Sequence, residues 1–190
     1  MAVARGRSSS GGAEDSDKAG DDPESVARII CLQLLTDRPR TRSELAAVLH
    51  RRGVQHDAAT TVLDRLGAVG LVDDAAFADQ WVHSRHTARG LGRRALAAEL
   101  RRKGVADDLA GEALASVDDA AEEQRANELV QRRLRSIPAD APYEAAARRL
   151  VGMLSRKGYP PGLAYRVVRA ALEQRGAELA ELNAADLAGD

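Results

Sequence analysis

The sequence contains very little cysteine and no long apolar run. Cys31 is its only cysteine, so an intramolecular disulfide is impossible and a zinc site built from cysteines is not expected. A single thiol suits a reducing compartment, and we expect a cytoplasmic protein. No stretch approaches the roughly 18 apolar residues of a spanning helix. Residues 1–24 also lack the apolar stretch of a secretory signal, so we expect no membrane association.

Aromatic and β-branched residues are also scarce. The aromatic residues are one Phe, one Trp and three Tyr, and no stretch alternates like a half-buried strand. Residues that favour helices dominate, so the sequence predicts an all-α protein. Phe77 and Trp81 lie one helical turn apart, and we expect core packing rather than a stacking platform for bases. Tyr159 and Tyr165 are likewise expected to pack in the C-terminal part.

Signatures of catalysis and of metal binding are missing. The sequence has no phosphate-binding loop of the Walker type and no dinucleotide-binding fingerprint. The Gly90–Gly92 segment is typical of a helix–helix turn, and the Asp73-Asp74 pair is typical of a helix N-cap. His83 and His86 could share a helix face, but no further residue has convincing ligand spacing. We therefore expect no enzyme, no cofactor and no metal.

The formal net charge of −1 conceals a division along the chain. Residues 1–24 carry 3 basic and 6 acidic side chains, and residues 173–190 carry 1 basic and 5 acidic ones. The segment between them, 25–172, therefore holds 24 basic and 18 acidic side chains, a net charge of +6. A basic central segment between acidic ends is compatible with a partner that carries phosphates or carboxylates.

One pattern occurs three times. Two leucines lie four residues apart, polar or cationic residues follow, and a glycine then stands where a helix C-cap needs positive φ. The glycines are 51 and then 54 residues apart. A further helix is indicated after each glycine. The three copies are Leu45–Val54, Leu96–Val105 and Leu150–Tyr159.

Each copy is preceded by another predicted helix, so a unit consists of three helices with the glycine turn before the last. The upstream helices are expected at residues 26–35, 75–89 and about 120–136. A capping box at Thr41–Glu44 predicts the start of the next helix in the first unit. We predict three tandem three-helix repeats in an elongated, curved array. Their bounds are 25–73, 74–118 and 119–175, between a disordered tail (1–24) and an acidic tail (176–190).

The most uneven charge lies in the second unit. Residues 85–103 contain seven basic side chains and one acidic one, and residues 107–123 contain seven acidic and no basic ones. Arg94 and Arg101 lie opposite the inward-facing Leu96 and Leu100 on one predicted helix. Such a face suits phosphates or carboxylates, although an ordinary solvated face or compensation of the helix dipole would give the same pattern. The candidate binding residues are Arg85, Arg89, Arg93, Arg94, Arg101, Arg102 and Lys103, with Arg156 and Lys157 at the equivalent place in the third unit.

The first unit also permits an alternative function. Residues 38–71 resemble the helices of a winged helix-turn-helix, whose last helix would enter the major groove. That helix would make the protein a DNA-binding regulator. Its only basic residue is Arg65, however, and Asp57 and Asp64 are acidic. No two-stranded wing follows.

A family resemblance spans residues 25–175. The segment Gly70–Ala78, followed by Trp81, Arg85, Gly92 and Glu99–Val105, resembles the central signature of the RecX family. These proteins are bacterial regulators of the RecA recombinase. The resemblance implies three tandem three-helix repeats, in agreement with the repeated pattern.

The resemblance also implies a partner and a function. Such a protein would bind the RecA–DNA filament and restrain ATP hydrolysis, strand exchange and LexA cleavage, and so act in DNA repair and the SOS response. We expect a monomer that binds single- or double-stranded DNA weakly and without sequence specificity. Arg85 and Lys103 are the plausible contacts among the matching positions, and the third unit departs most from the family pattern. The matching positions are Asp73, Asp74, Phe77, Arg85, Gly92, Glu99, Leu100, Lys103 and Gly104.

Overall fold

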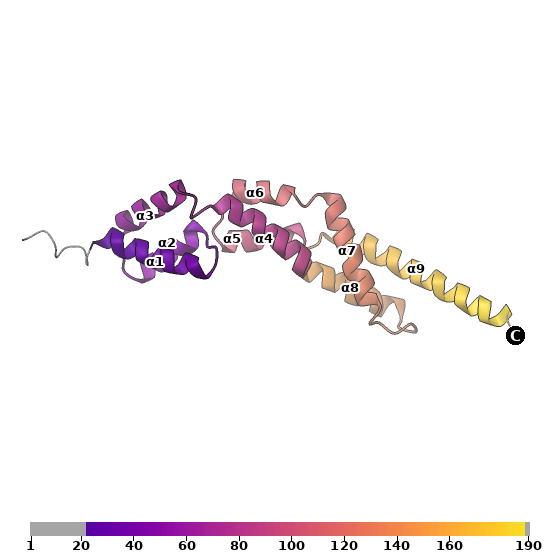
Figure 1. The fold of residues 1–190 in the computed structure, drawn as a ribbon. Helices are drawn as coiled ribbons and strands as arrows, with labels where there is room; N and C mark the ends of the chain where they lie inside the picture. The colour runs from indigo at the N-terminus through magenta and orange to yellow at the C-terminus, as the bar shows by residue number, and fades with distance from the viewer. Residues whose placement is uncertain (1–21, 189–190) are drawn as a thin grey trace, which may run out of the picture. The chain divides into compact units, whose positions relative to one another are not determined.

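The computed structural model describes residues 22–188, and every regular element in that range is an α-helix (Figure 1). The all-α prediction is therefore confirmed. The tail predicted to be disordered lies mostly outside the described residues. The helices are α1 (Pro23–Asp37), α2 (Arg42–Arg51), α3 (His56–Ala68), α4 (Asp74–Arg89), α5 (Arg93–Arg102), α6 (Asp107–Ala115), α7 (Asp119–Leu134), α8 (Tyr143–Arg156) and α9 (Pro161–Ala188).

Three hydrophobic cores follow one another along the chain, one for each repeat. The first draws on residues 27–72, the second on 77–117 and the third on 126–172. The leucine pairs of the repeated pattern are central to these cores, because all six side chains are fully buried. Three repeats with separate cores confirm the periodicity seen in the sequence. The exact repeat bounds stay a prediction.

The glycine of each repeat ends a helix as its spacing predicts. Gly53, Gly104 and Gly158 have φ values of +77°, +72° and +86°. In each turn the residue after the glycine donates its backbone N–H to the carbonyl of the second leucine, at 3.1, 3.2 and 3.1 Å. This is the bond of a Schellman C-cap, which only a left-handed residue permits without strain.

The chain divides into two compact units. The first contains residues up to Arg40 and Glu44–Val72, and within it α1 packs on α3. The second contains Thr41–Ser43 and everything from Asp73 onward. Within the second unit, α4 packs on α5 and α6, and α7 packs on α8 and α9. Among residues 22–188, no helix combines the length and the apolar character that crossing a membrane requires.

The helix ends partly agree with the sequence predictions and partly differ from them. α1 begins at Pro23, three residues before the predicted Val26, because Asp22 accepts hydrogen bonds from the backbone N–H groups of Glu24 and Ser25. Asp73 is the predicted N-cap of α4, and its carboxylate accepts from the Ala76 N–H at 2.9 Å. At the other end of the chain, α9 continues as one helix well beyond residue 175.

Candidate functional site

The aromatic pair of α4 lies beneath two of the candidate cations. Phe77 and Trp81 stack with ring centroids 5.5 Å apart, and Phe77 is buried, which confirms its predicted place in the core. The guanidinium carbon of Arg85 lies 4.0 Å from the Trp81 centroid, and the ammonium of Lys103 lies 4.7 Å from it. Both cations therefore interact with the π face of the half-buried tryptophan.

Glu99 on α5 completes this group. Its carboxylate accepts a hydrogen bond from the Trp81 indole N–H at 2.8 Å and lies 3.6 Å from the Arg85 Nε. The side chains of Arg85 and Glu99 are about one-fifth exposed. Arg85 and Lys103 thus hold α5 against α4, and each has an internal contact that a binding role would have to share.

Arg93 on α5 pairs with carboxylates of α7. The buried Glu122 accepts from both the backbone N–H of Arg93, at 2.8 Å, and its Nε, at 3.1 Å. The Arg93 guanidinium also pairs with Asp119. Because the carboxylate binds the first backbone N–H of α5, it also interacts with the positive end of that helix. Arg93 therefore joins the second repeat to the third.

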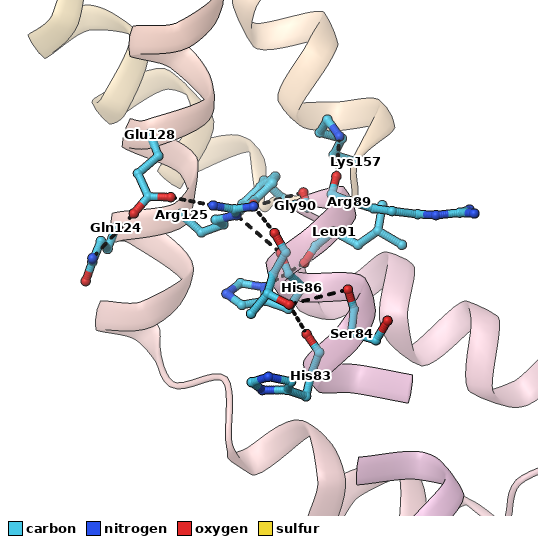
Figure 2. A network of polar contacts seen from close by, with 12 residues as sticks. His83, Ser84, His86, Arg89, Gly90, Leu91, Gln124, Arg125, Glu128 and Lys157 are labelled. Atoms are coloured by element: carbon cyan, nitrogen blue, oxygen red, sulfur yellow. Dashed lines mark hydrogen bonds and ion pairs between the residues drawn. The ribbon is translucent and has the colours of Figure 1, made fainter. Parts of the chain in front are cut away.

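The C-terminal end of α4 is capped by cations from the third repeat (Figure 2). The Arg125 guanidinium donates to the carbonyls of His86 and Thr87, and the Lys157 ammonium donates to the carbonyl of Arg89 at 2.5 Å. Positive charge at this end stabilises a helix because the last carbonyls carry the negative end of its dipole. Burial, together with the charges of Arg125 and Arg132, lowers the pKa of Lys157.

Two further bonds join the C-terminal end of α4 and the turn after it to the third repeat. We call this contact region between the second and third repeats the junction. The Tyr159 hydroxyl donates to the Gly90 carbonyl at 3.2 Å, and the Gly92 N–H donates to the Lys157 carbonyl at 2.8 Å. Burial is the first cause that raises the pKa of Tyr159, and the charge of Glu122 adds to it. The buried Tyr159 confirms its predicted packing role. It also shows that the Gly90–Gly92 segment is more than a turn, because it carries bonds to the third repeat.

An equivalent set of contacts surrounds Lys103 within the second unit. The Thr41 hydroxyl donates to the Lys103 carbonyl at 2.6 Å, just as the Gly92 N–H donates to the Lys157 carbonyl. Asp74 accepts from the Arg42 N–H at 2.8 Å, as Glu122 accepts from that of Arg93. In both sets, two acceptors bind the N-terminal end of a repeat's second helix, which is α2 in one set and α5 in the other. One acceptor is the backbone carbonyl of the residue before the glycine of the next repeat. The other is a carboxylate near the start of the first helix of that next repeat.

The remaining five candidate cations have exposed side chains. Within residues 22–188, no hydrogen bond or ion pair of these side chains is found. Figure 2 shows the Arg89 side chain extending away from Arg125. On α5, Leu96 and Leu100 face the core, so the arginines on the other side point to solvent. We call these five residues the exposed cation set: Arg89, Arg94, Arg101, Arg102 and Arg156.

Comparison with known proteins decides the family. Models of the RecX family match the chain three times: the first three-helix domain at residues 27–66, the second at 73–114 and the third at 121–168. The chain belongs to the RecX family. The matching positions that suggested this resemblance, from Asp73 to Gly104, all fall within the second of these RecX domains.

Relatives of known family have similar lengths. The chain is 52% identical over 161 residues to the regulatory protein RecX of Thermobifida fusca. This match covers 85% of this chain and 86% of the relative. It is 53% identical over 148 residues to the regulatory protein RecX of Mycolicibacterium smegmatis. That match covers 76% of this chain and 79% of the relative. The crystal structure of RecX from Lactobacillus salivarius has the same fold, with a TM-score of 0.70 at 19% identity over 78% of this chain and 96% of that one.

Sequence reasoning missed two residues of the junction between the second and third repeats, and it misplaced one tyrosine elsewhere in the third repeat. Glu122 belongs to the acidic run at residues 107–123, in which the sequence singled out no buried residue, but its side chain is buried. Its position was detectable, because it stands four residues before the buried Ala126 and eight before Val130 on one face of α7. Arg125 gave no such signal. Tyr165 was expected to pack, and this was wrong, because it is 66% exposed.

Proposed function

We propose that this protein regulates the RecA recombinase, mainly as an inhibitor. It would bind the RecA–DNA filament and restrain ATP hydrolysis, strand exchange and LexA cleavage, as a monomer in the cytoplasm that needs no cofactor. The observation that carries the proposal is the match of all three RecX domains, together with relatives that are called regulatory proteins. Regulation by binding also suits a chain in which sequence motifs for catalysis are missing.

The exposed cation set is the surface we propose for contact with the filament. Arginine binds phosphates and carboxylates through two parallel hydrogen bonds, and a RecA–DNA filament presents both groups. Arg94 and Arg101 lie two turns apart on the solvent side of α5, so they can engage successive anionic groups along one line. Because their guanidinium groups have no internal partner among the described residues, binding does not first require breaking an ion pair.

The other four candidate cations would support this surface rather than make the contact. Arg85 and Lys103 cover Trp81, Arg93 binds Glu122, and Lys157 caps α4. These interactions fix α5 against α4 and α7, which sets the direction in which the α5 arginines point. Their loss would mainly lower stability and would weaken filament binding only slightly, through a less rigid second unit.

The alternative of a helix-turn-helix DNA reader receives no support from α3. Its exposed acidic residues, Asp57 and Asp64, would face phosphates, and Arg65 is its one arginine. Base recognition in the major groove relies on donors such as unengaged arginine or asparagine. We therefore propose weak DNA binding without sequence specificity.

A titration of RecA tests the proposal. ATP hydrolysis by the cognate RecA on single-stranded DNA is measured with increasing amounts of the protein, and inhibition well below one molecule per RecA protomer is expected. The double variant Arg94→Glu with Arg101→Glu should inhibit at least about tenfold less well, since two charge-assisted contacts become repulsive. The variant Arg132→Glu with Arg135→Glu, at the C-terminal end of α7, has the same change in charge and should inhibit like the unaltered protein.

Two results would contradict the proposal. If the unaltered protein leaves ATP hydrolysis unchanged at every ratio, the regulatory function is wrong. If the α5 and α7 variants lose inhibition equally, only net charge matters and the assignment of the contact surface is wrong.

A further inference from the structure

We infer that a groove between α8 and α9 binds single-stranded nucleic acid by stacking bases on Tyr143 and Tyr165. The groove has a volume of about 730 Å³ and opens to solvent. No arginine of α5 lines it, whereas Arg156, another member of the exposed cation set, lies beside its Gly152. The inference rests on the proposed function only for the presence of DNA strands near the protein.

Two tyrosines stand at this groove with much of their surface in water. Tyr143 is 52% exposed and Tyr165 is 66% exposed. They come from different helices, since Tyr143 begins α8 and Tyr165 lies in the second turn of α9. The core of the repeat does not need them: Tyr159 is its buried tyrosine. A chain with so few aromatic residues therefore places two of them on one exposed groove.

The floor of the groove is apolar and includes a glycine. Ala147, Val151 and Val168 line it, together with Gly152 in the middle of α8. A glycine within a helix is unfavourable relative to alanine. Its missing side chain leaves room for the Arg156 guanidinium, because a Cβ on Gly152 would lie 3.3 Å from Arg156 Nη1. An apolar floor beside aromatic rings suits the faces of bases.

Arginines border the groove and favour an anionic occupant. Arg148, Arg166 and Arg169 line it, against one acidic residue, Glu144. Arg166 pairs with Glu123 at 2.9 Å and Arg169 with Glu173 at 3.5 Å, but all four side chains are about half exposed or more. Exposed ion pairs of this kind contribute little, so phosphates can replace the carboxylates.

Aromatic rings and arginines at one groove are the combination that binds single strands. Bases stack on the rings regardless of their identity, and the backbone phosphates bind the cations. A duplex is a poor occupant, because its base faces are already covered by neighbouring base pairs. An acidic protein segment could use the arginines but would gain little from the two aromatic rings. The groove therefore favours an unpaired strand.

The inference can be tested without RecA. A fluorescein-labelled oligothymidylate is titrated with the full chain, and binding is measured by fluorescence anisotropy at fixed salt. Replacing both rings, Tyr143→Ala with Tyr165→Ala, should raise the Kd at least about tenfold, because each stacked base contributes appreciably. Tyr143→Phe with Tyr165→Phe keeps the rings and should stay within about twofold of the unaltered protein. Circular dichroism checks that all variants are folded.

The outcomes separate this inference from the proposed function. Equal binding by the alanine variant, loss of binding in the phenylalanine variant, or no binding by the unaltered protein would overturn the stacking site. Binding of poly-glutamate with the same dependence on the two rings would overturn it in favour of a site for acidic protein segments. RecA inhibition is measured on the same variants. If no variant and not even the unaltered protein inhibits RecA, while oligothymidylate binding still depends on the two tyrosine rings, the proposed function is wrong and the groove assignment is correct.

Discussion

Arg93 and Arg94 are neighbours in the sequence but have opposite surroundings. Arg93 is held by Glu122 and Asp119 at the junction between the second and third repeats, whereas the Arg94 side chain is exposed on the other side of α5. The same contrast separates Lys157, which caps α4, from the exposed Arg156. Basic residues that are adjacent in the sequence therefore belong to two groups. One group forms contacts at the junction, and the other is exposed and available to a partner.

The contrast predicts that changes at the junction affect stability, whereas changes on the exposed side affect binding. The strongest test at the junction is Gly158→Ala. Gly158 has φ +86°, and an added Cβ would lie 2.4 Å from the Ala95 backbone nitrogen. Left-handed backbone and a collision with backbone atoms together should lower the free energy of unfolding by about 3 kcal/mol or more. Urea unfolding measures this value.

Gly53→Ala is the matched control. Gly53 has nearly the same φ, +77°, but a Cβ there would meet nothing within 4 Å. Only the backbone penalty applies, so the expected loss is about 1 kcal/mol. If the two variants lose the same amount, the close approach at the junction does not contribute.

The next largest effect is expected for Glu122→Ala. It removes the buried carboxylate that binds both the backbone N–H and the guanidinium of Arg93. The free energy of unfolding should fall by about 2–3 kcal/mol, because a backbone donor loses its partner and a charge-assisted bond is lost. Glu123→Ala removes the adjacent, exposed partner of Arg166 and should cost no more than about 0.5 kcal/mol. Equal losses would show that Glu122 has no special role.

Tyr159→Phe should cost about 1 kcal/mol at neutral pH through the lost hydrogen bond to Gly90. Because burial raises the pKa of Tyr159 above its ordinary value of 10.0, the unfolded chain ionises first as the pH rises. The unfolded state then binds fewer protons than the folded one, so this residue's contribution to stability falls above about pH 10. The gap between the unaltered protein and Tyr159→Phe should therefore narrow there in thermal unfolding. A constant gap would contradict the assignment.

The exposed side predicts the smallest effects on stability. Tyr165→Phe and Arg94→Ala should each change the free energy of unfolding by less than about 0.5 kcal/mol, since neither side chain has a buried partner. Thermal unfolding of both variants provides this check. A large loss in either would show that the side chain has a structural role.

Much of the fold could be predicted because the determining signals are local. The leucine pairs lie one turn apart, and each glycine stands where a left-handed residue must end the helix. The N-cap at Asp73 and the burial of Phe77 followed from the same short-range rules. The three repeats were therefore evident from a single chain.

The junction could not be predicted in the same way because it joins distant residues. Arg125 binds carbonyls of α4, which lie 38 and 39 residues earlier, and an exposed carbonyl leaves no trace in the sequence. Arg93 and Arg94 look alike in the sequence, and only the position of Glu122 distinguishes them. Tyr165 was misplaced for a similar reason: an aromatic residue near a core indicates packing on average, yet α9 turns this one outward.

The most direct test of the central claim compares the two neighbouring arginines. Arg93→Ala and the pair Arg94→Ala with Arg101→Ala are assayed for thermal unfolding and for inhibition of RecA ATP hydrolysis. Arg93→Ala should lower the unfolding midpoint and, below that midpoint, retain most of its inhibition, whereas the pair should unfold like the unaltered protein and lose inhibition. If the pair inhibits fully, or if Arg93→Ala loses inhibition without loss of stability, the division into junction and contact cations is wrong.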